Sequence, residues 1–186
     1  NNSTKSKSNN YYKKKIVKHL EFTTFENKEQ WEFLYKTHKY NFEVIGGTSI
    51  NNENVYVINF FPRKKGLYKG RLYISIETNA LIRADFKYAP NKIGLYAQAF
   101  GISYTKTNFS GSIYFEKINN SYNLKYLSFQ DNNKYGIKRN VALQKKKKRF
   151  LINKKINEIK IGIDLKVQEK RSIELLVIDH LKISDI

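Results

Sequence analysis

The chain has 186 residues, about the length of one domain, and 40% of them are hydrophobic, so it can bury a core and is no disordered tail. The absence of cysteine excludes disulfides, cysteine-ligated zinc and thiol catalysis. A formal net charge of +19, from 35 Lys and Arg against 16 Asp and Glu, favours an anionic partner such as nucleic acid, a lipid headgroup or acidic polysaccharide. Nucleic acid is disfavoured, because Arg, which suits phosphate and guanine best, is scarce.

The N-terminal part is expected to pass from a linker to a strand and then a helix. Residues 1–10 are polar and are interpreted as a flexible linker cut from a longer chain, and 11–186 as a single β-rich domain. Tyr11–Thr24 is expected to form a first strand. From Lys28 to His38 the period changes, because Trp31, Leu34, Tyr35 and His38 recur at helical spacing. That pattern predicts one amphipathic helix of about three turns, docked on the sheet.

From Phe42 onward the period is mostly two, which predicts a series of antiparallel strands. Gly46 and Gly47 indicate a bulge, Val55–Phe61 is apolar on both faces, and Asn79 suits a tight hairpin turn. Further strands are expected at Leu95–Thr105, Gly111–Ile118, Tyr122–Gln130, Tyr135–Leu143, Ile159–Val167 and Ile173–Ile183, the last two joined by a turn at Gln168–Ser172. Nine to eleven strands predict a mainly β (α+β) fold, a curved antiparallel sheet or half-barrel meander with one helix.

No motif of an enzyme or a metal site is present. The histidines, His19, His38 and His180, share no ligand spacing, and His38 is interpreted as a structural residue of the helix. The carboxylate pairs Glu26/Glu29 and Asp164/Glu169 are interpreted as ordinary charged positions, although sequence spacing does not exclude a glycosidase pair. We therefore expect no enzyme, no cofactor and no metal.

Two basic clusters are candidates for contact with an anionic partner. Arg63–Lys65 is interpreted as a solvated loop. The longer cluster, Lys145, Lys146, Lys147, Lys148 and Arg149, is the candidate site, because each lysine near an anionic membrane contributes about 1 kcal/mol. The alternative is a set of edge lysines that block strand-to-strand aggregation.

The stretch Val55–Tyr88 resembles a segment of a bacterial family, the carboxypeptidase-like regulatory domain-containing envelope proteins of Bacteroidota. The likeness is carried by Phe60–Pro62, the basic loop after it, Gly70–Ile74 and the return strand Ala80–Phe86, and it extends over most of Phe42–Ile186. The family name refers to a preceding domain and implies no peptidase activity. The resemblance implies an exported protein at the periplasm or outer membrane, and its β region is similar to the half-barrels of lipoprotein carriers.

Together these features predict a non-enzymatic scaffold or binding module of the cell envelope, part of a larger exported protein. Its expected partner is an envelope protein or outer-membrane complex, or an anionic lipid. One alternative is a carrier-like module with a groove for an acyl chain, in competition with a core that Tyr and Phe fill. The others are a polysaccharide hydrolase and a nucleic-acid-binding protein.

Overall fold

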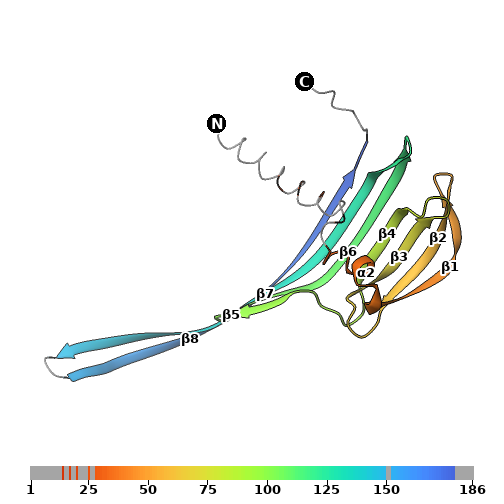
Figure 1. Ribbon diagram of the computed structural model, residues 1–186. Coiled ribbons are helices and arrows are strands. Elements are labelled where there is room, and N and C mark those ends of the chain that lie inside the picture. Colours follow the sequence, from red (N-terminus) through yellow and green to blue (C-terminus); the bar gives the residue numbers. More distant parts are fainter. Residues whose placement is uncertain are drawn as a thin grey trace, which may run out of the picture. The chain divides into compact units, whose positions relative to one another are not determined.

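The fold is described from a computed structural model, which covers Lys14, Val17, Leu20, Phe25 and residues 28–149 and 152–178, without the side chains of 144–149 and 152–157 (Figure 1). The elements in chain order are the helix α2 (Glu32–Tyr35), the 3-10 helix η1 (Thr37–Lys39), and the strands β1 (Tyr40–Ile50), β2 (Glu53–Pro62), β3 (Tyr68–Ser75), β4 (Leu81–Tyr88), β5 (Tyr96–Ala99), β6 (Ile102–Ile118), β7 (Ser121–Arg149) and β8 (Ile152–Leu176). Among the described residues, no helix has both the length and the apolar character needed to cross a membrane.

The strands form one antiparallel sheet in the order β1-β2-β3-β4-β6-β7-β8, with β5 paired to β6. The predicted mainly β fold, an antiparallel sheet with a helix, is therefore confirmed, and the helix is shorter than the three turns expected. Consecutive strands are neighbours because tight turns join them, and asparagines with positive φ occupy three of these turns: Asn51 and Asn52, Asn79, and Asn119 and Asn120. The predicted bulge is also present, since the β1–β2 register shifts between Val44 and Gly46.

Several predicted strand limits are wrong, because the strands of the second half are longer than expected. Gln168–Ser172 is no turn but lies within the C-terminal third of β8, and it contains no Gly, Pro or Asn that would stop a strand. Conversely, the single strand expected at Leu95–Thr105 is a hairpin, β5 and β6, that turns at Phe100 (φ 49°) and Gly101 (φ 75°). The prediction thus missed the turn at Gly101 and mistook the charged strand segment Gln168–Ser172 for a turn.

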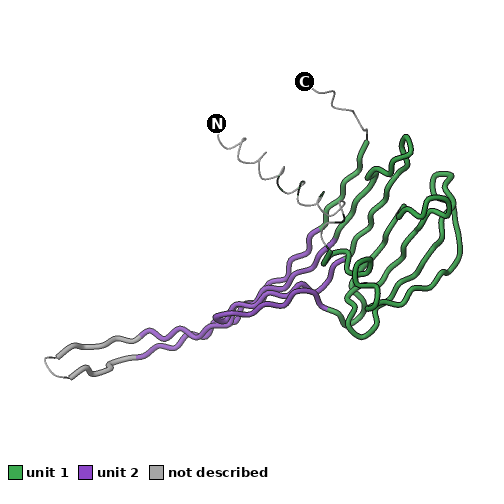
Figure 2. Tube along the Cα trace, in the orientation of Figure 1, with its two compact units in different colours: residues 1–92, 110–129, 172–186 green, residues 93–109, 130–171 purple. Residues whose placement is uncertain are grey.

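The chain divides into two compact units (Figure 2). Unit 1 contains residues 1–92, 110–129 and 172–186, and unit 2 contains residues 93–109 and 130–171. The strands β6, β7 and β8 contribute residues to both. Whether residues 11–186 form one domain stays a prediction.

The core of unit 1 is built around the aromatic side chains of Trp31 and Phe33, which are fully buried. The Phe33 ring stacks on Phe60 of β2 at 4.4 Å, and Trp31 lies 5.5 Å from Phe86 of β4. Phe25 bridges Trp31, at 4.7 Å, and Phe115 of β6, at 5.7 Å. These contacts attach the segment Trp31–Lys39, which we call the helical segment, to one face of the sheet. They favour a filled core over an acyl-chain groove at this place.

The prediction for the helical segment is right about docking and wrong about the docked face. Trp31 and Phe33 are buried, whereas Tyr35 is 47% exposed and His38 is also exposed. The reason is that α2 has only four residues and is followed by the 3-10 helix η1, so no 3.6-residue period extends from Trp31 to His38.

The strand predicted at Tyr11–Thr24 is wrong, because its described residues Lys14, Val17 and Leu20 are helical. Val55–Phe61 differs from expectation too. It is not covered on both sides, since Tyr56 and Phe61 of β2 are 45% and 43% exposed.

The buried hydroxyl of Tyr40 joins the helical segment to the sheet. It donates a hydrogen bond to Glu32 Oε1 (3.0 Å) and accepts hydrogen bonds from the backbone N–H groups of Leu67 (3.0 Å) and Tyr68 (3.2 Å). Burial, with a smaller contribution from the charge of Glu32, raises the pKa of Tyr40 to about 12. Burial also raises the pKa of Tyr68. Both phenols are therefore neutral at physiological pH.

This arrangement predicts a loss of stability in alkali. An unfolded tyrosine ionises at about pH 10, and the folded Tyr40 keeps its proton to about pH 12, so above pH 10 the folded state binds more protons and the free energy of unfolding falls as pH rises. Urea unfolding at about pH 9 and pH 11 measures the fall. It should be smaller in Tyr40→Phe, which is also destabilised at neutral pH by about 1–3 kcal/mol because Leu67 N–H and Tyr68 N–H lose their acceptor. An equal fall in both proteins would contradict this role of Tyr40.

Candidate functional site

The candidate site lies on the outward face of β2, β3, β4 and β6 in unit 1, opposite the face that packs on Trp31 and Phe33. Alternate residues of a strand point to opposite sides of a sheet, and residues paired across strands point to the same side. The register Asn59–Arg71–Asp85–Ser112 therefore forms a polar row across four strands, and Lys69 and Lys87 form the next row.

A groove of about 580 Å³ follows these two rows, a volume in the range of small-molecule sites. We call it the basic groove. Its lining residues are Asn59, Phe60, Phe61, Lys69, Gly70, Arg71, Tyr73, Asp85, Phe86, Lys87, Ser110 and Gly111. Three cationic side chains thus face a single carboxylate.

Hydrogen bonds fix the polar row, so that its groups are oriented before any ligand arrives. Arg71 Nε donates to Asn59 Oδ1 at 3.2 Å, and Ser112 Oγ donates to Asp85 Oδ1 at 2.6 Å. Arg83 Nε lies 2.9 Å from Asp85 Oδ2, and its guanidinium stands over the Tyr73 ring at 5.5 Å. The carboxylate of Asp85 is already paired with Arg83, and the groove keeps an excess of positive charge.

The two lysines of the groove face each other directly across the β3–β4 pair. Like charges in this position destabilise a sheet. Neither ammonium group has a hydrogen-bond or ion-pair partner within the part of the chain that the structure describes, and Lys69 is partly buried. An anionic group between Lys69 and Lys87 would relieve the repulsion and gain two charge-assisted hydrogen bonds.

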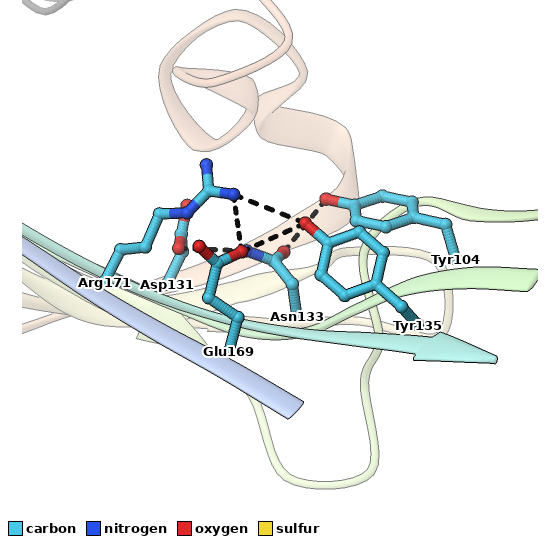
Figure 3. A network of polar contacts seen from close by, with 6 residues as sticks. All are labelled: Tyr104, Asp131, Asn133, Tyr135, Glu169 and Arg171. Atoms are coloured by element: carbon cyan, nitrogen blue, oxygen red, sulfur yellow. Dashed lines mark hydrogen bonds and ion pairs between the residues drawn. The ribbon is translucent and has the colours of Figure 1, made fainter. Parts of the chain in front are cut away.

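Unit 2 carries a second polar cluster, at the strands β6, β7 and β8 (Figure 3). Tyr135 OH donates to Glu169 Oε2 (3.1 Å) and accepts from Arg171 Nη2 (3.3 Å), while Glu169 and Arg171 also form an ion pair. Beside them, Tyr104 OH donates to Asn133 Oδ1 (2.9 Å).

The tyrosines of this cluster are poor proton acceptors at neutral pH. Burial raises the pKa of Tyr104, and the charge of Asp131 raises it further. Desolvation, followed by the hydrogen bond to Glu169, raises the pKa of Tyr135. The phenols stay protonated and hold Glu169 and Asn133 in place, which is a structural role.

The predicted candidate residues fall outside both clusters. Lys145, Lys146, Lys147, Lys148 and Arg149 end β7, and their side chains lie outside the described part of the structure. Arg63 donates from Nε to Asn41 Oδ1 at 2.8 Å, and Lys64 and Lys65 are exposed, as expected of a solvated loop.

The pair Asp164/Glu169 does not form a carboxylate dyad. The two residues are five positions apart on the continuous strand β8, so their side chains point to opposite faces of the sheet. Glu26, His19 and His180 lie outside the described residues. Within the described residues, no three His, Asp or Glu side chains are grouped so as to hold a metal ion.

Sequence reasoning missed the basic groove, although Lys69, Arg71, Arg83 and Lys87 alternate along two neighbouring strands. The sequence analysis drew no functional inference from these alternating positions. The available signal was the hairpin register, which places Lys69 opposite Lys87. Comparison with known proteins adds no name to this site, since no family model, curated protein or solved structure matches the chain.

Proposed function

We propose that this chain is a non-enzymatic binding module of the bacterial cell envelope, which holds an anionic lipid headgroup in the basic groove. One observation carries the proposal. Lys69 and Lys87 lie directly opposite each other across the β3–β4 pair, beside Arg71, and neither ammonium group has a partner among the described residues. The net charge of +19 brings anionic surfaces to the protein, and the groove supplies the point of recognition.

The chemistry of the groove suits a phosphodiester headgroup. Two ammonium groups and a guanidinium bind phosphate oxygens, and the amide of Asn59 and the hydroxyl of Ser110 offer hydrogen bonds to glycerol or sugar hydroxyls. The aromatic rings of Phe61 and Tyr73 provide apolar contact at the same face. Placement in the envelope, in a larger exported protein associated with outer-membrane components, rests on the resemblance to the Bacteroidota proteins.

Binding without catalysis is the reading that the polar groups favour. Asp85 is engaged by both Arg83 and Ser112, so it is a poor general base. The raised pKa values of Tyr104 and Tyr135 keep these two phenols of unit 2 neutral, and Asp164 and Glu169 point to opposite faces of β8. A polysaccharide hydrolase needs two acids in one cleft, which this arrangement does not supply from those residues.

The test is co-sedimentation with vesicles of phosphatidylcholine containing about 30% phosphatidylglycerol. Lys69→Gln/Lys87→Gln should weaken binding about 30-fold, because each lysine near an anionic membrane contributes about 1 kcal/mol. The matched control, Lys138→Gln/Lys160→Gln, removes the same charge outside the groove and should weaken binding less than about threefold. Equal losses in the two variants would show general electrostatic attraction and would overturn the groove as the site.

A further inference from the structure

The hairpin of β5 and β6 in unit 2 turns at two residues, Phe100 and Gly101, that binding in the basic groove does not use. Ala99 pairs with Ile102, and both turn residues have positive φ (49° and 75°), which is the type I′ geometry of tight hairpins. Asparagine and glycine suit this geometry, because a bulky side chain is strained in the left-handed region. A phenylalanine is therefore an unfavourable choice at the first position of this turn.

Two other hairpins of the chain have the same kind of turn and fill it with asparagine. Asn51 and Asn52 join β1 to β2, and Asn119 and Asn120 join β6 to β7. The first residue of these turns has a φ of 46° or 48°, close to the 49° of Phe100. The backbone thus needs no phenylalanine here, and strain that folding does not require points to a use of the side chain.

The Phe100 ring is exposed on a turn that hydrogen bonds fix. Its side chain is 91% exposed, more than any other large hydrophobic side chain among the described residues. Arg139 Nε donates to the carbonyl oxygen of Phe100 at 3.0 Å, and the backbone N–H of Lys138 donates to that of Gly101 at 2.7 Å. A Cβ at Gly101 would overlap the carbonyl oxygen of Lys138, so glycine is required beside the ring. The turn therefore presents an ordered aromatic ring to solvent.

The surroundings of the turn are strongly basic. Unit 2, residues 93–109 and 130–171, contains 15 Lys and Arg against four Asp and Glu. The guanidinium of Arg139 is held beside Phe100 by its Nε, and its Nη groups have no partner among the described residues. An apolar ring next to a free guanidinium matches the boundary between the acyl chains and the anionic headgroups of a bilayer.

We propose that Phe100 inserts its ring into the interface of an anionic bilayer, while Arg139 and Lys138 pair with lipid phosphates. The inference rests on the proposed function for the anionic lipid, and it adds a second contact to the headgroup in the basic groove. The turn suits insertion, because the carbonyl oxygens of Phe100 and Gly101 already have donors and lose little on leaving water. Ile102, which is 49% exposed, follows the turn and adds apolar contact.

A bilayer suits this turn better than a pocket of a partner protein. A standard protein interface buries about 800 Å² on each partner, whereas a phenylalanine ring supplies only about 150–250 Å². A bilayer needs no larger contact, because the remaining attraction comes from its surface charge acting on the many cations of unit 2.

Co-sedimentation of the whole chain with vesicles of phosphatidylcholine and about 30% phosphatidylglycerol, combined with thermal unfolding, tests the inference. Phe100→Asn should weaken vesicle binding about 10-fold or more, because the ring no longer leaves water. It should leave the unfolding temperature equal or higher, because asparagine suits the turn. Phe100→Trp is the matched control and should bind at least as tightly as the wild type, since tryptophan favours the bilayer interface.

Fluorescence of Phe100→Trp reports insertion directly. Trp31 is fully buried, so the wild type gives the background signal. Phosphatidylcholine brominated on its acyl chains, mixed into the same vesicles, should quench the new indole and leave the signal of Trp31 nearly unchanged. The quenching should persist, at a lower apparent affinity, when Lys69→Gln/Lys87→Gln is added. Failure of the turn and failure of the basic groove are thereby told apart.

The inference is overturned by vesicle-bound Phe100→Trp that the brominated lipid does not quench, or by equal vesicle binding of Phe100→Asn and the wild type. A Phe100→Asn variant that unfolds well below the wild type would also overturn it, because the ring would then be a structural element. So would a wild type that does not bind the vesicles, whereas headgroup binding in the basic groove is measured separately with a soluble short-chain phosphatidylglycerol.

Discussion

Trp31→Ala should lower the free energy of unfolding by about 3–5 kcal/mol, the usual cost of removing a large buried aromatic side chain. Trp31 is fully buried, and its ring contacts Phe25, Phe33 and Phe86. The cavity would lie where the helical segment meets β4, so the segment from Glu32 to Lys39 should detach before the sheet unfolds.

Urea unfolding followed by circular dichroism measures this change, since Trp31 is the sole tryptophan and the variant has no indole fluorescence. His38→Ala is the matched control. The helical pattern of the sequence places His38 on the same face as Trp31, yet its side chain is exposed, so we expect a change within about 0.5 kcal/mol. A large effect of His38→Ala, or a neutral Trp31→Ala, would contradict the packing described for the helical segment.

Gly70→Ala should destabilise unit 1 by about 3 kcal/mol and deform the basic groove. A Cβ at this position would lie 2.0 Å from the carbonyl oxygen of Asp85 and 2.8 Å from Phe86 Cα. Both neighbours are backbone atoms of β4, so no side-chain rotation relieves the overlap, and the two strands must separate. Since Lys69 and Arg71 flank Gly70, the separation also displaces two cations of the groove.

Gly47→Ala is the control for this prediction. Its Cβ would lie 3.4 Å from the carbonyl oxygen of Val55, an ordinary van der Waals distance. Thermal unfolding should show Gly47→Ala unchanged or slightly stabilised, because alanine lowers the entropy of the unfolded chain. Similar losses of stability and of vesicle binding in the two variants would mean that the close approach of β3 and β4 at Gly70 is not required.

The sequence allowed prediction of the features that depend on local alternation and turn chemistry. Ile82, Ala84 and Phe86 lie on the buried face of β4 as their period of two indicates, and Asn79 adopts the left-handed turn conformation. Alternation fails where the backbone shifts. The β3–β4 register slips between Tyr73 and Ile74. Beyond this point Ser75 is buried and Ile76 is 42% exposed, whereas strict alternation from the buried Leu72 would bury Ile76 and expose Ser75.

The candidate site was less accessible to prediction, because cross-strand pairing creates it. Lys69 and Lys87 are 18 positions apart, and only the register of the hairpin brings them face to face. Runs of charge such as Lys145–Arg149 are conspicuous in a sequence, while two lysines opposed across a strand pair are not. The burial of Phe33 in place of Leu34 and Tyr35 likewise depends on the shortness of α2, which no periodicity reports.

The most direct test of the basic groove is an amide-resolved NMR titration with dihexanoyl phosphatidylglycerol below its micelle concentration. The proposal predicts saturable chemical-shift changes at Lys69, Arg71, Lys87 and Ser110, and their loss in Lys69→Gln/Lys87→Gln. Shifts confined to Lys145–Arg149, or an unchanged titration in that variant, would contradict the basic groove as the site of anion recognition.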